Sequence, residues 1–223
     1  MKMSIFELVN KKQRNIFFRL VSPMASTPDR FNSSNSRLQS PRTTASPSGT
    51  TVGASRVRDA VEKFFDLIQK RHITIQKGAQ YCNAIESIKK GVLEPKTENC
   101  NPYPPNLELY CKNLGLLNGI LEDVVTDADT IVQQLKVLEL VMKDEVVSKS
   151  WNLQRVLNTL EQILQSFRSE LFLRKVVAEN IGHGCTEHEL SLHVTFWEQL
   201  SNQNEEVQLL LKMLASEFNI AVT

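Results

Sequence analysis

The sequence lacks any apolar run of the roughly 18 residues that a membrane-spanning helix needs. It also lacks an excess of either charge, because 26 Lys and Arg face 25 Asp and Glu, a formal net charge of +1. A near-neutral chain has no electrostatic footprint of a nucleic-acid-binding protein. With 223 residues, 41% of them hydrophobic, we expect a soluble protein of one or two domains that binds neither a membrane nor nucleic acid directly.

Cysteine and proline are also used sparingly. The four cysteines, at positions 82, 100, 111 and 185, have neither CxxC spacing nor the density of a disulfide scaffold, so we expect a reducing nuclear or cytosolic setting. All eight prolines stand at or before Pro105, and their absence from the rest of the chain favours long helices. The proline-rich stretch 91–105 predicts a stiff linker.

Residues 1–55 differ from the rest of the chain in composition. They carry eight basic and two acidic residues, and from Ser22 to Ser55 they are rich in Ser, Thr, Pro and Asn with few large apolar side chains. Such a segment cannot bury enough surface to offset its ordering entropy. We therefore predict a disordered basic tail over residues 1–55. Within it Thr27, Ser40 and Ser46 each precede a proline, so they are candidate sites for proline-directed phosphorylation.

The first 21 residues mix apolar and basic side chains and leave two interpretations open. A mitochondrial presequence has this kind of composition. The alternative is that Met24, in the sequence MASTPDR, starts the functional chain. Glu7 and the missing small-residue cleavage pattern favour the second interpretation.

The strongest periodicity lies in residues 106–147, where apolar positions alternate in steps of three and four. This row of apolar positions, called the seam below, has the heptad spacing of a helix that packs one apolar face against partner helices. Its members are Leu107, Tyr110, Leu114, Leu117, Leu121, Val124, Ala128, Ile131, Leu135, Leu138 and Met142.

Two further stretches have the same alternation and can supply the partner helices. Residues 56–90 repeat it with Arg71 and Gly78 at seam positions, and residues 151–181 repeat it with Arg174. Shorter helices are expected at 187–200, opened by a Thr186 and Glu189 capping box with a Cys185–Leu190 staple, and at 203–219. The predicted fold is all-α: an elongated antiparallel three-helix coiled-coil bundle over residues 56–223, with a C-terminal helical hairpin.

Candidate chemistry is scarce. No GxSxG, Walker A or GxGxxG motif occurs. His183, Cys185, His188 and His193 lie close in sequence, but the spacing of His188 and His193 differs from the paired histidines of HExxH. The group Glu122, Asp123, Asp127 and Asp129 lacks EF-hand spacing and is interpreted as a solvated helix face. We therefore predict no catalytic, metal or cofactor site and no enzyme activity.

Gly115 and Gly119 share one helix face outside the seam and have two interpretations. Small side chains there can admit another helix at close range. The alternative is a local bend, because glycine is unfavourable in a helix interior.

Residues 167–183 read FRSELFLRKVVAENIGH, with Trp151 upstream and Leu190, Trp197, Leu210, Met213 and Leu214 downstream. This stretch resembles the cyclin-dependent kinase 2-interacting protein family, abbreviated CINP. Arg168, Glu170, Arg174 and Lys175 fall on the family's pattern. The earlier helices fit only in order and amphipathic pattern, whereas the tail and linker differ.

The resemblance implies a non-enzymatic nuclear adaptor, with the cytoplasm as a second location. Family members are associated with cyclin-dependent and origin-firing kinases, with a checkpoint kinase complex acting after DNA damage, and with AAA+ ATPase subunits that serve replisome turnover and large ribosomal subunit maturation. The residues expected to contact partners are Arg168, Glu170, Arg174, Lys175 and Trp197, although Trp197 has a core role as its alternative. The competing hypothesis is a structural coiled-coil subunit or tether without a signalling role.

Overall fold

The structure is a computed structural model in which residues 48–93, 103–142, 145–200 and 205–221 are described. The chain divides into two units, residues 1–44 and 45–223, and every described residue belongs to the second. This unit contains five α-helices and one short 3-10 helix among its described residues. They are α2 (Ser48–Leu93), α3 (Pro105–Met142), α4 (Leu153–Asn180), η1 (Ile181–His183), α5 (Glu187–Gln199) and α6 (Glu205–Phe218).

The all-α class is confirmed for this part of the chain. The described residues contain no strand, only an isolated bridge between Val146 and Asn152. None of the helices found there combines the length and the apolar character that crossing a membrane requires.

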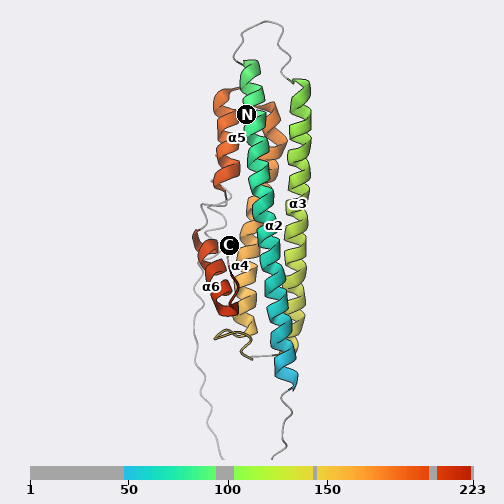
Figure 1. Cartoon of the computed structure of the whole chain (residues 1–223), viewed down its shortest axis with the longest axis vertical. Helices are drawn as coiled ribbons and strands as arrows, with labels where there is room; N and C mark the ends of the chain where they lie inside the picture. Colours follow the sequence, from blue (N-terminus) through green and yellow to red (C-terminus); the bar gives the residue numbers. More distant parts are fainter. Residues whose placement is uncertain (1–47, 94–102, 143–144, 201–204, 222–223) are drawn as a thin grey trace, which may run out of the picture. The chain divides into compact units, whose positions relative to one another are not determined.

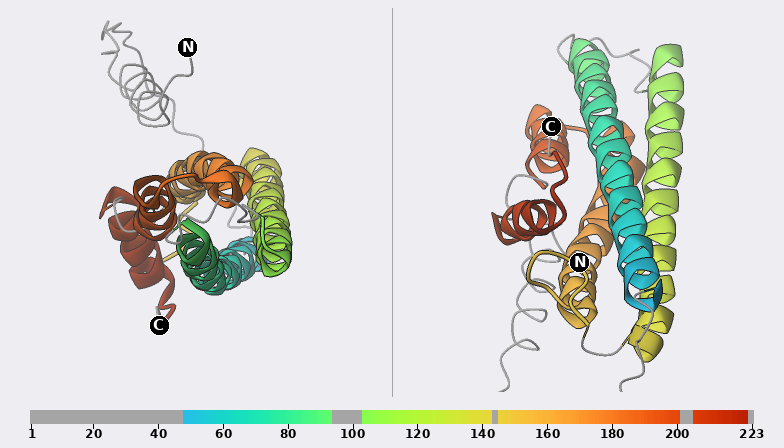
Figure 2. Two further views of the ribbon diagram at one scale, coloured as in Figure 1. Left: turned by 90° about the horizontal axis from the view of Figure 1, so that it is seen from above. Right: turned by 60° about the horizontal axis from the view of Figure 1, so that its bottom comes forward.

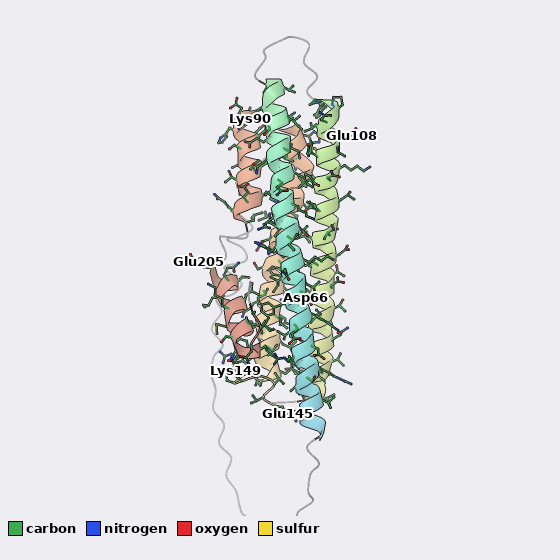
Figure 3. All side chains as sticks on the ribbon, in the orientation of Figure 1. Asp66, Lys90, Glu108, Glu145, Lys149 and Glu205 are labelled. Carbon is green, nitrogen blue, oxygen red and sulfur yellow. The ribbon has the colours of Figure 1, made fainter. Side chains whose placement is uncertain are left out.

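The three long helices α2, α3 and α4 lie side by side (Figures 1 and 2). Lys90, near the end of α2, and Glu108, near the start of α3, mark one end of the pair, whereas Glu145 lies at the other end (Figure 3). Gly53 lies against Met142 and Tyr81 against Tyr110, so α2 and α3 run antiparallel. The seam predicted in α3 supplies most of that helix's buried apolar side chains.

The core consists of two apolar clusters that follow one another along the long helices. One joins the first part of α2 to the second part of α3, to α4 and to α6. The other joins the second part of α2 to the first part of α3, to the end of α4 and to α5. Each short helix thus covers a different cluster. This arrangement differs from the predicted hairpin, because α5 packs mainly on α2 and α6 on α4 rather than on each other.

Local sequence signals account for several helix starts. Asn152 caps α4 by accepting a hydrogen bond from the Arg155 amide, and Thr186 caps α5 by accepting one from the Glu189 amide. The Glu189 carboxylate accepts from the Cys185 amide at 2.9 Å, which completes a reciprocal cap. The predicted hydrophobic staple between Cys185 and Leu190 is not observed. The Cys185 side chain is exposed, and Gly184 lies against Leu190 instead.

Two predicted boundaries are wrong. Helix α2 begins at Ser48, so residues 48–55 are helical and not part of a disordered tail. The buried Gly53 packs under Met142, which extends the α2 and α3 contact into that segment. Helix α3 ends by Met142 rather than at residue 147, because Val147 turns into the core and its amide donates to the Trp151 carbonyl.

Glycines occupy two very different environments in these helices. Gly78 is buried, and a Cβ atom there would overlap the ring of Trp197. Gly115 and Gly119 lie in continuous helix, where an added Cβ would meet no atom within 4 Å. No described helix therefore approaches Gly115 or Gly119 closely, whereas at Gly78, as at Gly53, an added side chain would overlap a neighbouring one.

The same substitution should change stability in opposite directions at these sites. Gly78→Ala should lower the free energy of unfolding by about 1 to 3 kcal/mol, because the indole ring must move. Gly115→Ala should raise it by about 1 kcal/mol through helix propensity. Urea denaturation measures both, and a loss of stability in Gly115→Ala would contradict the open environment.

Candidate functional site

Three of the five residues predicted to contact partners lie inside the protein. Arg174 is 1% exposed, Glu170 8% and Trp197 0%. The prediction of a partner-binding surface is therefore wrong for these three in this fold, because buried side chains cannot touch a partner. Arg168 and Lys175 are exposed and remain candidates.

Glu170 holds together the two basic residues that interrupt the apolar seams. Arg71 of α2 donates a hydrogen bond to the Glu170 carboxylate, and an Arg174 guanidinium nitrogen lies 3.8 Å from the same carboxylate. The Arg71 guanidinium also stacks over Phe167 at 4.2 Å. Arg71 and Arg174 interrupt the apolar seams of different helices, and together with Glu170 they form one buried charge cluster, Arg71–Glu170–Arg174.

The cluster carries a net positive charge at neutral pH. Burial lowers the pKa of Arg174 to about 10, while Glu170 opposes the shift, and burial likewise lowers the pKa of Arg71. Arg174, with a pKa of about 10, stays protonated at pH 7, and arginine in general keeps its charge in proteins. A small cavity against the cluster has room for about one water molecule. The arrangement accordingly serves packing rather than ligand binding.

Trp197 couples α5 to this cluster. Its indole nitrogen donates to the Ile75 carbonyl at 3.0 Å, and its own carbonyl accepts a hydrogen bond from Arg174. The Arg174 guanidinium lies over the indole ring at 5.1 Å. Trp197 is therefore a core residue that anchors α5 to both α2 and α4.

The exposed candidates belong to a row of ion pairs between α3 and α4. Lys136 pairs with Glu161 at 2.6 Å, Asp129 with Arg168 at 2.7 Å, and Glu122 with Lys175 at 3.4 Å. Successive pairs are seven residues apart on both helices and run in opposite directions. This charge ladder follows the antiparallel register of α3 and α4, and each of its side chains is about half exposed.

The sequence analysis missed a polar residue in the seam of α3. Asn118 is buried where Leu117 was predicted, and its amide lies 3.5 Å from the Arg174 carbonyl. Its side-chain oxygen accepts no hydrogen bond from the described residues. The sequence did contain a signal for this residue, because Asn118 directly follows Leu117, which was assigned to the seam. A buried Asn at such a position restricts the register of packed helices.

The residues weighed as metal ligands do not converge. His183 is exposed, with its Nδ1 3.2 Å from the Tyr103 hydroxyl, and the Cys185 thiol donates to the His183 carbonyl. His193 is buried, which lowers the pKa of its imidazole, and His188 is exposed. No group of three potential ligands was found within the described residues.

Two other groups of residues were singled out in the sequence, the acidic group of α3 and the phosphorylation candidates of the tail. In the acidic group on α3, Glu122 and Asp129 belong to the charge ladder, whereas Asp123 and Asp127 are exposed. The phosphorylation candidates Thr27, Ser40 and Ser46 lie outside the described residues.

Neither the known protein-family models nor the curated proteins contain a match to this chain.

Removal of the shared carboxylate should be highly destabilising. Glu170→Gln should lower the free energy of unfolding by about 3 to 5 kcal/mol, because two buried guanidinium groups lose their counter-charge. The matched control is Glu161→Gln, which removes a half-exposed ladder carboxylate and should cost less than about 1 kcal/mol. Equal losses in urea denaturation would show that the cluster does not act as a buried ion pair.

The described thiols should differ widely in reactivity. Burial raises the pKa of Cys82 to about 12 and raises that of Cys111, which suppresses their thiolates, whereas Cys185 is exposed. In a Cys100→Ser background, an aromatic disulfide reagent at pH 8 should modify Cys185 first and Cys82 only on unfolding. Mass spectrometry of the labelled peptides measures the order, and early labelling of Cys82 would contradict its burial.

Proposed function

We propose that this chain is a non-enzymatic nuclear adaptor similar to the CINP family. In this role it links cyclin-dependent and origin-firing kinases, checkpoint signalling after DNA damage, and AAA+ ATPase subunits acting in replisome turnover and large ribosomal subunit maturation. The processes come from the resemblance of residues 167–183, and the protein is nuclear with the cytoplasm as a second location.

The observation that carries the proposal is the charge ladder between α3 and α4. Two of its cations, Arg168 and Lys175, belong to the segment that resembles the family, and both keep about half of their side-chain surface accessible. Exposed ion pairs contribute little to stability. We therefore infer that the exposed charges of Arg168 and Lys175 form a pattern that a protein partner recognises.

The same ladder supports a coiled-coil arrangement of the long helices. Pairs that repeat every seven residues on both helices are typical of the flanking positions beside a heptad seam. We propose that α2, α3 and α4 form an antiparallel coiled-coil bundle, with α5 and α6 each adding a fourth helix to one half of it.

The second candidate function is a structural coiled-coil subunit or tether. The exposed apolar side chains of α3, such as Leu116 and Val137, favour it, because an apolar helix face can pair with another chain. Light scattering of the full chain separates the two: a monomer at all concentrations favours the adaptor, and self-association favours the tether.

A charge swap tests whether partners read the ladder directly. Arg168→Glu with Lys175→Glu should abolish recovery of kinases or AAA+ ATPase subunits by the tagged full chain from nuclear extract, while helicity is kept. Adding Asp129→Arg and Glu122→Lys restores the intrachain pairs with inverted charge. This four-fold variant should still fail to recover partners, as measured by quantitative mass spectrometry.

The third pair of the ladder provides the matched control. Lys136→Glu with Glu161→Lys inverts a pair outside the resembling segment and should leave partner recovery unchanged. If the four-fold variant recovers partners normally, Arg168 and Lys175 only position helices, and the proposed surface is wrong.

A further inference from the structure

The C-terminal helix α6 is joined to the rest of the protein in two ways. Along its length, apolar side chains of α6 pack into the cluster that they share with α4. The buried residues of α6 are Val207, Leu211, Leu214, Ala215 and Phe218. At its C-terminal turn, hydrogen bonds join α6 to the loop that precedes α4. This second attachment therefore depends on a few polar groups at one end of the helix.

One carboxylate, that of Glu217, receives most of these hydrogen bonds. The Ser148 hydroxyl and the Ser150 amide each donate to its Oε2 atom at 2.9 Å, and the Ser150 hydroxyl donates to its Oε1 atom at 2.9 Å. The ammonium group of Lys149, a residue labelled in Figure 3, donates to the Ser216 carbonyl at 2.6 Å. Hydrogen bonds to a charged acceptor are stronger than those between neutral groups. Glu217 is thus the polar anchor of α6.

The two serines differ in accessibility. An isolated antiparallel bridge joins Val146 to Asn152, so both serines lie at the tip of a short loop. Ser150 is exposed, whereas Ser148 is half-buried and its oxygen also accepts a hydrogen bond from the Trp151 amide at 3.2 Å. Enzymes reach exposed loop tips of small polar residues readily, as the preference of proteases for them shows. Ser150 therefore presents the more accessible of the two hydroxyl groups.

We propose that Ser150 is a phosphorylation site whose modification releases α6 from α4. A serine kinase catalyses the reaction: the Ser150 oxygen bonds to the γ-phosphorus of ATP, the bond from that phosphorus to ADP breaks, and the hydroxyl proton leaves to a base of the kinase. Trp151 follows Ser150, so this kinase is not proline-directed, unlike one that acts on the tail candidates. The inference is independent of the adaptor function, because it follows from contacts between α6 and the loop.

The phosphate reverses the character of the contact with Glu217. The unmodified Ser150 hydroxyl donates a hydrogen bond to the carboxylate, whereas phosphoserine carries a charge of about −1.5 to −2 and presents acceptor oxygens. Two anions then lie where one donor met one acceptor, and they repel each other. The phosphate also attracts the Lys149 ammonium away from the Ser216 carbonyl, which removes a further contact of α6.

Helix α5 provides an internal reference for this release. It is anchored through Trp197, whose indole donates to the Ile75 carbonyl and whose own carbonyl accepts a hydrogen bond from Arg174. These contacts involve neither the loop at Ser150 nor Glu217. Modification of Ser150 therefore changes the attachment of α6 while that of α5 is kept.

Incorporation of phosphoserine at position 150 of the full chain tests the release. Amide hydrogen exchange in α6 should become at least about tenfold faster than in the unmodified chain, because exchange reports local opening. Exchange in α5 should be unchanged. The matched control is phosphoserine at position 191, where Ser191 is an exposed residue of α5, and it should leave the exchange of α6 unchanged.

Two variants separate charge repulsion from the loss of a hydroxyl donor. Ser150→Ala removes the donor without adding charge and should accelerate α6 exchange less than the phosphate does. Glu217→Gln removes the repelled carboxylate, so phosphoserine at position 150 should accelerate exchange by at most about threefold in that background. An effect of Ser150→Ala equal to that of the phosphate, or an undiminished phosphate effect in Glu217→Gln, would contradict the proposed repulsion.

Phosphorylation itself is measured on the full chain incubated with nuclear and cytosolic extract, ATP and phosphatase inhibitors. Mass spectrometry should find phosphate on the Ser150 peptide, and the signal should be absent from Ser150→Ala. Three results would overturn the inference: phosphate on Ser148 instead, no phosphate in this loop, or phosphate on Ser150 without faster exchange in α6.

Discussion

The fold depends on the neutralisation of basic side chains within an apolar interior. Arg71 and Arg174 occupy seam positions of different helices, where a lone guanidinium would be strongly unfavourable. Glu170 supplies one carboxylate to both, and the aromatic rings of Phe167 and Trp197 cover the two guanidinium groups. The two apolar clusters of the core lie on either side of this charge cluster. The position of Glu170 therefore restricts how α2 can slide along α4.

The charge cluster also determines where α5 lies. Arg174 donates to the backbone carbonyl of Trp197, and the indole ring occupies the space that Gly78 leaves open on α2. A shift of α5 by one turn would remove both contacts. Helix α6 is held differently, by apolar packing on α4 and by the Glu217 carboxylate, which accepts hydrogen bonds from Ser148 and Ser150.

Charged residues recur at heptad spacing in two places on this molecule, and their surroundings differ. Between α3 and α4 the opposite charges lie on neighbouring helices and pair in the antiparallel register. Along α2, Arg56, Lys63, Lys70 and Lys77 have the same spacing, but their nearest carboxylates include Asp59 and Asp66 of the same helix. The contrast separates charges that join two helices from charges that are balanced largely within one helix.

The sequence by itself determined the helical class, the seam of α3 and the cap at Thr186, because these follow from spacing within one helix or from hydrogen bonds over three residues. It identified Arg71, Gly78 and Arg174 as irregular positions without explaining them. Only the tertiary structure decided that Glu170 pairs with both arginines, that Trp197 covers Gly78, and that α5 and α6 pack on different helices. Glu170 and Arg174 are only four residues apart, but the Arg71–Glu170 and Ile75–Trp197 contacts join residues about 100 positions apart. Helical periodicity carries no information about which distant residue completes a buried polar group.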